Sequence, residues 1–321
     1  MDDYYSIADG DLNGLEQFLL DSRYSENYRE QLAVSNQALL GRIENAVAAG
    51  SCKELLHIKS IALGEPALLL EIIFSRADIL NSRLILRALA TKTISGPPPR
   101  WHSYGALGST FYDDLWRKSP SIMDITERCY SDGHPFAIAL ADSLLDFNRG
   151  IDIQVAERVL LLGVIKRLFA SLEDISSSNA RIVRKFLGLT VDMWNIGIWI
   201  RRRAGYVSTD PTDDVYIVGG AWLDSKKLTE SKAMADLVHA TPWRKVVRGI
   251  DEKAPRDFQR ALSIDMWNWQ MNLFREDPLG IQVAIGYVAK QLVEWENLNL
   301  LSVGMAMGLS SQNLLNRLIH V

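Results

Sequence analysis

A helical segment that occurs three times constrains the fold of this chain more than any other feature. Its copies are DILNSRLILRA at 78–88, DMWNIGIWIRR at 192–202 and EWENLNLLSVG at 294–304. Each copy begins with an acidic residue, has asparagine at its fourth position and continues with mostly apolar residues. The asparagines lie 114 (195 − 81) and 102 (297 − 195) positions apart. This recurrence predicts a chain that is built from three related units.

Further markers follow the first two copies in the same order. YGALGSTFYDDLW at 104–116 follows the first copy, and YIVGGAWLDSKKL at 216–228 follows the second. A proline and an aromatic residue then start a helix in HPFAIAL at 134–140 and in TPWRKVV at 241–247. No such module follows the third copy, but residues 5–19 resemble it faintly. We therefore expect the N-terminal stretch to complete the third unit.

Helical periodicity dominates the rest of the chain. Apolar residues recur at three- and four-residue spacing over 64–93, 134–147, 153–173, 179–204, 226–239, 255–275 and 278–309. Only DVYIVGG at 214–220 resembles a strand. The prediction is an all-α fold with three helical repeat domains, at 1–132, 133–238 and 239–321.

Composition excludes several classes of protein. A hydrophobic content of 48% and a charged content of 23% are typical of a globular chain. The net charge of −4 offers no field that would attract nucleic acid. No apolar run approaches the ~18–20 residues of a membrane span. We expect a protein that does not bind nucleic acid, does not span the membrane itself, and reaches a membrane only through a partner.

The chain also lacks recognisable catalytic motifs. Glu54 and His57, like Asp236 and His239, have the spacing of a helical ligand pair, but each pair offers two ligands where zinc needs three or four. There is no phosphate-binding loop of the G-x-x-x-x-G-K-[ST] type and no nucleophile elbow. The sequence predicts no catalytic residue, no cofactor site and no metal site.

The acid–asparagine pairs are the candidate core of the repeats. An acid and an asparagine three positions apart share one face of a helix. One interpretation is that each asparagine satisfies a backbone group where helices pack while the acid is solvated. Another is that the three repeats converge and the acids form a cluster. The candidate residues are Asp78, Asn81, Asp192, Asn195, Glu294 and Asn297.

Two further features of the repeated helices have alternative interpretations. Arg201, Arg202 and Arg203 either oppose the dipole at a helix C-terminus or contact acidic groups of a partner. Gly304 and Gly308 either allow another helix to approach closely or mark the end of the third copy.

The sequence resembles the C subunit of the rotary V/A-type ATPases, which is called the d subunit in the eukaryotic enzyme. The resemblance extends over roughly 35–315 and is carried by FSRADILNSRLILRALATK, FLGLTVDMWNIGIWIRRR, YIVGGAWLDSKKL and, above all, DPLGIQVAIGYVAKQLVEWENLNLLSVGMAMGLS at 277–310. Departures are the acidic stretch after Tyr4 and Tyr5, and Gly197 and Asn299, which stand where the family often has a basic residue.

This resemblance implies three similar helical domains arranged with pseudo-threefold symmetry into a funnel. It also implies a non-catalytic rotor adaptor on the cytoplasmic face of the membrane. Such an adaptor joins the shaft subunits D and F to the membrane proteolipid ring and transmits rotation for ATP-coupled ion transport. The residues leave two alternatives open, an α-helical enzyme with a central acidic pocket and a helical scaffold of another complex.

Overall fold

The structure is a computed structural model that describes residues 2–34, 37–94, 96–119, 121–205, 215–251 and 253–320. Every regular element within these ranges is a helix, and no strand occurs in them. The predicted all-α class is therefore confirmed.

The chain forms two compact units. The first contains Met1–Ala62, Gln270–Pro278 and Val283–Val321, and the second contains Leu63–Trp269 and Leu279–Gln282. The N-terminal and C-terminal segments therefore belong to the same unit. The division into three domains with pseudo-threefold symmetry stays a prediction.

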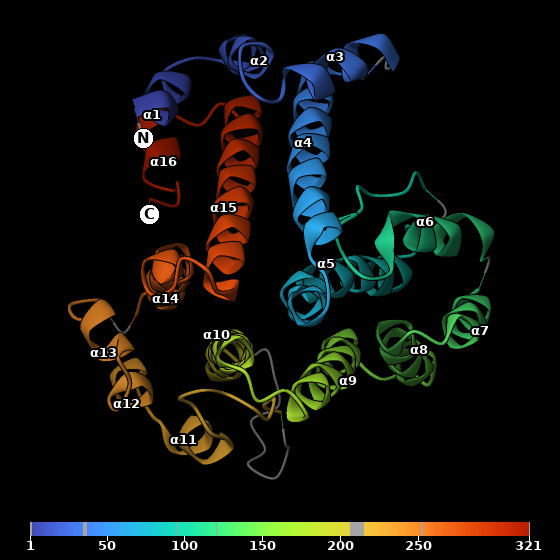
Figure 1. Cartoon of the computed structure of the whole chain (residues 1–321), viewed down its shortest axis with the longest axis vertical. Helices are drawn as coiled ribbons and strands as arrows, with labels where there is room; N and C mark the ends of the chain where they lie inside the picture. Colours follow the sequence, from blue (N-terminus) through green and yellow to red (C-terminus); the bar gives the residue numbers. More distant parts are fainter. Residues whose placement is uncertain are drawn as a thin grey trace. The chain divides into compact units, whose positions relative to one another are not determined.

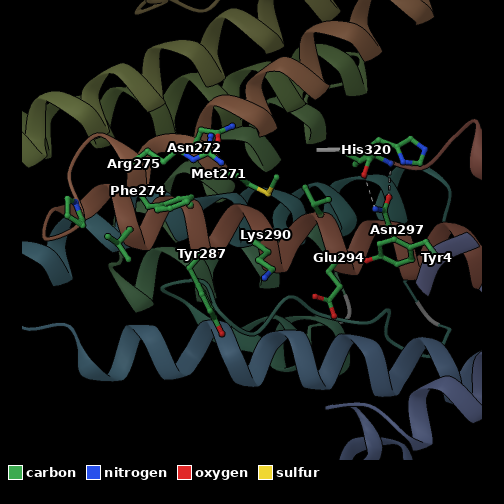
Figure 2. A pocket seen from close by; sticks show the side chains of 15 residues that line it. Tyr4, Met271, Asn272, Phe274, Arg275, Tyr287, Lys290, Glu294, Asn297 and His320 are labelled. Atoms are coloured by element: carbon green, nitrogen blue, oxygen red, sulfur yellow. Dashed lines mark hydrogen bonds between the residues drawn. The ribbon is translucent and has the colours of Figure 1, made fainter. Parts of the chain in front are cut away.

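The first unit is built around two long helices that lie alongside each other, α4 and α15 (Figures 1 and 2). Tyr287 on α15 donates a hydrogen bond to the Glu54 carboxylate on α4 at 2.7 Å. The elements of this unit are α1 (Asp2–Ala8), α2 (Leu12–Leu20), α3 (Ser25–Val34), α4 (Leu39–Ile61), the 3-10 helix η1 (Leu273–Arg275), α15 (Ile281–Ala306, from Val283 onward) and α16 (Ser311–Leu315).

The second unit begins with a succession of packed helices. α8 packs against both α7 and α9, and α9 packs against α5 (Figure 1). The elements are α5 (Glu65–Ala90), α6 (Gly108–Lys118), α7 (Ile122–Asp132), α8 (Pro135–Asn148), α9 (Ile153–Glu173), α10 (Ser178–Arg203), α11 (Ser225–Glu230), α12 (Met234–Val238), α13 (Trp243–Val246) and α14 (Pro255–Asn272, up to Trp269).

The three copies of the repeat lie on α5, α10 and α15, and each of these helices has 26 residues. Pro66 stands in the first turn of α5, where its missing N–H costs nothing. Ser177 caps α10 by accepting the N–H of Ala180 at 3.0 Å. The repeat seen in the sequence is therefore also a repeat of helix length.

Two predicted elements differ in the structure. Residues 215–220 of the predicted strand are irregular, and the backbone of Ile217 pairs with the Asn195 side chain instead of another strand. The helix predicted at 226–239 is split into α11 and α12, since Asp236 accepts the N–H of Ala233 at 3.2 Å and starts a new helix there.

The two late glycines of α15 have different roles. Gly308 has a φ of 71° and ends the helix with a Schellman motif, in which its N–H donates to Met305 at 3.0 Å and the N–H of Leu309 donates to Gly304 at 2.9 Å. At Gly304, a Cβ atom would overlap the buried side chain of Leu314 on α16. Both interpretations of the glycines are thus correct, one for each residue.

We expect Gly308→Ala to lower the free energy of unfolding by about 1–2 kcal/mol, because an L-residue is strained at positive φ. Urea denaturation followed by circular dichroism measures this change. Met307→Ala is the control, since Met307 is 73% exposed and its truncation should change stability by less than about 0.5 kcal/mol. Equal effects of the two substitutions would contradict the assignment.

Candidate functional site

Each repeat asparagine binds the backbone of one residue farther along the chain. Its side-chain N–H donates to the carbonyl of that residue, and its side-chain oxygen accepts the N–H of the same residue. The pairs are Asn81 with His102 (2.9 and 2.9 Å), Asn195 with Ile217 (2.8 and 2.8 Å) and Asn297 with Ile319 (3.1 and 2.8 Å). The sequence separation is 21, 22 and 22 positions. A reciprocal pair of this kind is what a neighbouring strand would supply.

All three asparagines are buried, with at most 2% of the residue exposed. A side-chain amide both donates and accepts in a single plane. Each asparagine therefore fixes the segment that follows its helix and leaves no polar backbone group of the bound residue unpaired. Each asparagine thus satisfies a backbone group, but the group lies in the segment after the helix and not where two helices pack.

The acid of the first copy binds the same loop. Asp78 is 1% exposed, and its carboxylate accepts the N–H groups of Ala106 at 2.7 Å and Leu107 at 3.1 Å. The hydroxyl of Tyr112 donates to it at 3.3 Å. Gly105 makes this approach possible, because a Cβ atom there would overlap the carboxylate. The loop therefore closes directly over the acid.

The second copy repeats this arrangement. The Asp192 carboxylate is fully buried and accepts the N–H groups of Trp222 at 2.8 Å and Leu223 at 3.1 Å. A Cβ atom at Gly220 would overlap the carboxylate. Burial raises the pKa of Asp192 to about 6, although the backbone N–H groups oppose the shift. Burial likewise raises the pKa of Asp78. Neither acid is solvated, and each is enclosed by its own loop.

The third copy has different partners for its acid. Glu294 forms an ion pair with Arg23 at 2.9 Å and accepts a hydrogen bond from the Tyr24 hydroxyl at 3.0 Å. Burial, and next the charge of Glu294, raise the pKa of Tyr24 to about 12. Tyr4 lies beside Glu294 and Asn297 (Figure 2). Residues from the N-terminal stretch thus take the place that a following loop has in the first two copies.

A groove of about 770 Å³ runs along α15 in the first unit (Figure 2). Its walls combine apolar side chains such as Met271, Val283 and Phe274 with the charged groups of Lys290 and Glu294. Phe274 is 47% exposed. Because Arg23 and Tyr24 already engage Glu294, the groove offers mainly apolar surface.

Two further kinds of feature are absent from the described residues. They contain no group of three or more histidine, cysteine, aspartate or glutamate side chains that could hold a metal ion. Nor does any helix in the described ranges have both the length and the apolar character that a membrane crossing needs.

The arginine run lies in the last turn of α10. The guanidinium of Arg203 lies 4.9 Å from the centre of the Trp199 ring, and that of Arg202 lies 5.9 Å from the Tyr216 ring. Arg201 instead lines a pocket of the second unit. The role of these residues in contacting a partner stays a prediction.

Sequence reasoning missed the role of Gly105 and Gly220, which let the loop approach the acid. Each follows the tyrosine of its module and lies at nearly the same distance from the acid of its repeat, and this spacing is the signal that could have revealed them. It also missed the partnership of Arg83 and Glu157, which are 74 positions apart. No local pattern connects those two residues.

The fold is thus a helical repeat architecture in which the polar residues of the long helices hold loops and termini. The sequence profile of the family described as ATP synthase (C/AC39) subunit matches residues 2–317, nearly the whole chain. The chain belongs to this family.

Relatives with assigned names agree with this membership. The chain is 24% identical over 272 residues to the C subunit of the A-type ATP synthase of Methanosphaera stadtmanae, which covers 81% of this chain and 70% of the relative. It is 24% identical over 269 residues to the C subunit of the V-type ATP synthase of Thermus thermophilus, covering 80% of this chain and 76% of the relative.

We expect Asn195→Ala to lower the free energy of unfolding by about 2–4 kcal/mol, because it leaves the buried N–H and carbonyl of Ile217 unpaired. Urea denaturation tests this value. Asn45→Ala is the control, since the Asn45 side chain is bonded only to Gln37 in an exposed position. The corresponding change at Asn81 should resemble that at Asn195. An effect no larger than that of the Asn45 control would disprove the role of the amide.

Asp192 should make stability depend on pH. Its folded-state pKa of about 6 lies above the ordinary value of 3.8, so the stability that its carboxyl contributes is complete below about pH 4 and is lost as pH rises through about 6. The loss is at most about 3 kcal/mol, since one pKa unit corresponds to about 1.4 kcal/mol. We expect the difference in unfolding free energy between wild type and Asp192→Asn to fall over this range and to be constant above pH 7. A difference that does not vary with pH would contradict this assignment.

Proposed function

We propose that this chain is the non-catalytic rotor adaptor of a V/A-type ATPase. In this role it joins the shaft subunits D and F to the membrane proteolipid ring and transmits rotation for ATP-coupled ion transport. The observation that carries the proposal is the family match over residues 2–317. Its relatives are named as the C subunits of A-type and V-type ATP synthases.

Anchored loops and a closely packed core support this role. A part that transmits torque must not yield where it is loaded. The loops after α5 and α10 are held at two points, by the asparagine and by the acid of the repeat. Large aromatic side chains such as Trp243, Tyr104 and Phe74 are almost completely buried, which gives close packing and low compressibility.

The engagement of the acids supports a structural role over catalysis. The carboxylates of Asp78 and Asp192 accept backbone N–H groups of their own loops, and Glu294 is paired with Arg23. A general acid or base needs a carboxylate that faces a substrate. In this proposal the chemistry belongs to other subunits of the complex.

The proposal includes the placement of the chain. It would be peripheral at the cytoplasmic face, bound through the ATPase complex, with three similar domains arranged as a funnel. The contact candidates are the loop at 94–108 and Arg201–Arg203. The other candidate loop, at 207–220, lies largely outside the described residues.

Assembly and pumping test the proposal together. We expect the tagged chain to co-purify with the shaft subunits and the proteolipid ring. Vesicles that contain the complex without this chain should hydrolyse ATP without driving ion transport, and adding the purified chain should restore transport. Full pumping without the chain would refute the proposal, and so would a preparation in which it joins neither the shaft nor the ring.

A further inference from the structure

The second unit contains a pocket of about 400 Å³ between α5, α9 and α10. Its lining includes four arginines and one carboxylate, that of Glu157; the arginines are Arg83, Arg87, Arg158 and Arg201. The chain as a whole carries a net charge of −4. This pocket is therefore a local concentration of positive charge on an acidic protein.

Glu157 fixes two of these guanidiniums. Arg83 donates to its carboxylate through Nε at 3.0 Å and Nη2 at 2.7 Å, and Arg87 donates through Nε at 2.5 Å. Burial alone would raise the pKa of Glu157, but the hydrogen bonds from Arg87 and Arg83 outweigh it and lower the pKa. Two positive charges thus share one negative charge, and their geometry is set before any ligand arrives.

Arg201 adds a positive charge that has no such partner. It makes no hydrogen bond or ion pair with any of the described residues, and its side chain is exposed. Partial burial of its head group, and next the charge of Arg83, lower the pKa of Arg201, although the charge of Glu157 opposes them. The repulsion among these guanidiniums would be relieved by an incoming anion.

The rest of the lining indicates what carries that anion. Trp194 and Met193 stand beside the guanidiniums and present apolar surface. A free inorganic anion would contact the arginines and leave this surface wet. A carboxylate side chain within a protein segment brings hydrocarbon with it and covers both parts of the pocket.

We infer that the pocket formed by Arg83, Arg87, Arg201 and Trp194 is a docking site for an acidic segment of a partner protein. A carboxylate of that segment pairs with Arg201 and with the free edge of Arg83, and neighbouring apolar groups pack on Trp194. Of the three arginines in the run, only Arg201 lines this pocket. The inference deepens the proposed function and rests on it for the existence of a partner, but the pocket is tested with the isolated chain.

The test measures fluorescence anisotropy of a labelled decapeptide of alternating Glu and Leu, titrated with the full-length chain at 25 mM and 150 mM salt. The same peptide with Gln in place of Glu is the ligand control. Arg201→Glu should weaken binding at least about tenfold, because it removes one charge-assisted pair and adds a repulsion. Lys166→Glu makes the same change in net charge at an exposed position of α9 outside the pocket, and it should alter binding less than about twofold.

Glu157→Gln gives a prediction of the opposite sign. Removing the internal carboxylate frees Arg83 and Arg87 for the ligand, so the peptide should bind about three- to tenfold more tightly at low salt. A residue with only a structural role would weaken binding or leave it unchanged. Thermal unfolding checks that each variant is folded. If Arg201→Glu does not fold, Arg201→Gln replaces it, and a smaller loss of peptide affinity is expected.

Several results would overturn the inference. Equal losses in Arg201→Glu and Lys166→Glu would mean that the peptide senses only net charge. Competition by inorganic phosphate as effective as competition by unlabelled peptide would mean a small-anion site. Absence of wild-type binding at 25 mM salt would mean that the pocket does not bind acidic segments. None of these results concerns co-purification with the complex, so the two proposals fail separately.

Discussion

The reciprocal pair of hydrogen bonds between a buried asparagine amide and one distant peptide unit is the interaction on which this architecture depends. The asparagine lies about two-thirds of the way along a 26-residue helix and binds a residue about 22 positions away. Asn195 holds Ile217, and the residues after Ile217 run toward the N-terminus of the helix. The N–H of Trp222 therefore lies at the Asp192 carboxylate. The later helix residue binds the earlier loop residue, so the loop runs antiparallel to the helix. A spacing of three residues, about 4.5 Å along the axis, places the acid where the loop N–H groups arrive.

The three copies show a relation between the length of the acidic side chain and the kind of group that donates to it. Asp78 and Asp192 have short side chains, and each accepts backbone N–H groups of a loop that a glycine lets approach. Asp78 also accepts the hydroxyl of Tyr112. The third copy has glutamate, which is one methylene longer, and its ligands are the ends of the Arg23 and Tyr24 side chains. In all three copies the acid lies three positions before the asparagine. The longer acid, glutamate, occurs in the copy whose donors are side chains.

The sequence predicted those parts of the fold that arise from local periodicity. The long helices, the end of α15 at Gly308 and the acid–asparagine pairs all followed from short-range patterns. The partners of these pairs did not, because the backbone groups that they bind lie 21–31 positions away in the first two copies, and the partner of Glu294 at Tyr24 lies 270 positions away. Residues 215–217 resembled a strand because they are apolar, yet Ile217 pairs with the amide of Asn195. The helices α1–α4 were not predicted, although Asp11, which caps α2 by accepting the N–H groups of Asn13 and Gly14, was a readable start signal.

Charged groups of the second unit are of two kinds. Some are bonded within the fold and contribute to its stability, and others are available for recognition. The carboxylate of Asp192 is fully enclosed, and its cost of desolvation is offset only in part by backbone N–H groups that would otherwise need partners themselves. Arg83 and Arg87 are held by a single carboxylate, and Arg201 is exposed beside them. A charge that only had to support the fold would be hydrogen-bonded within the fold, as the carboxylate of Asp192 is. The unmatched positive charge beside an apolar wall is therefore best explained by something that binds from outside the chain.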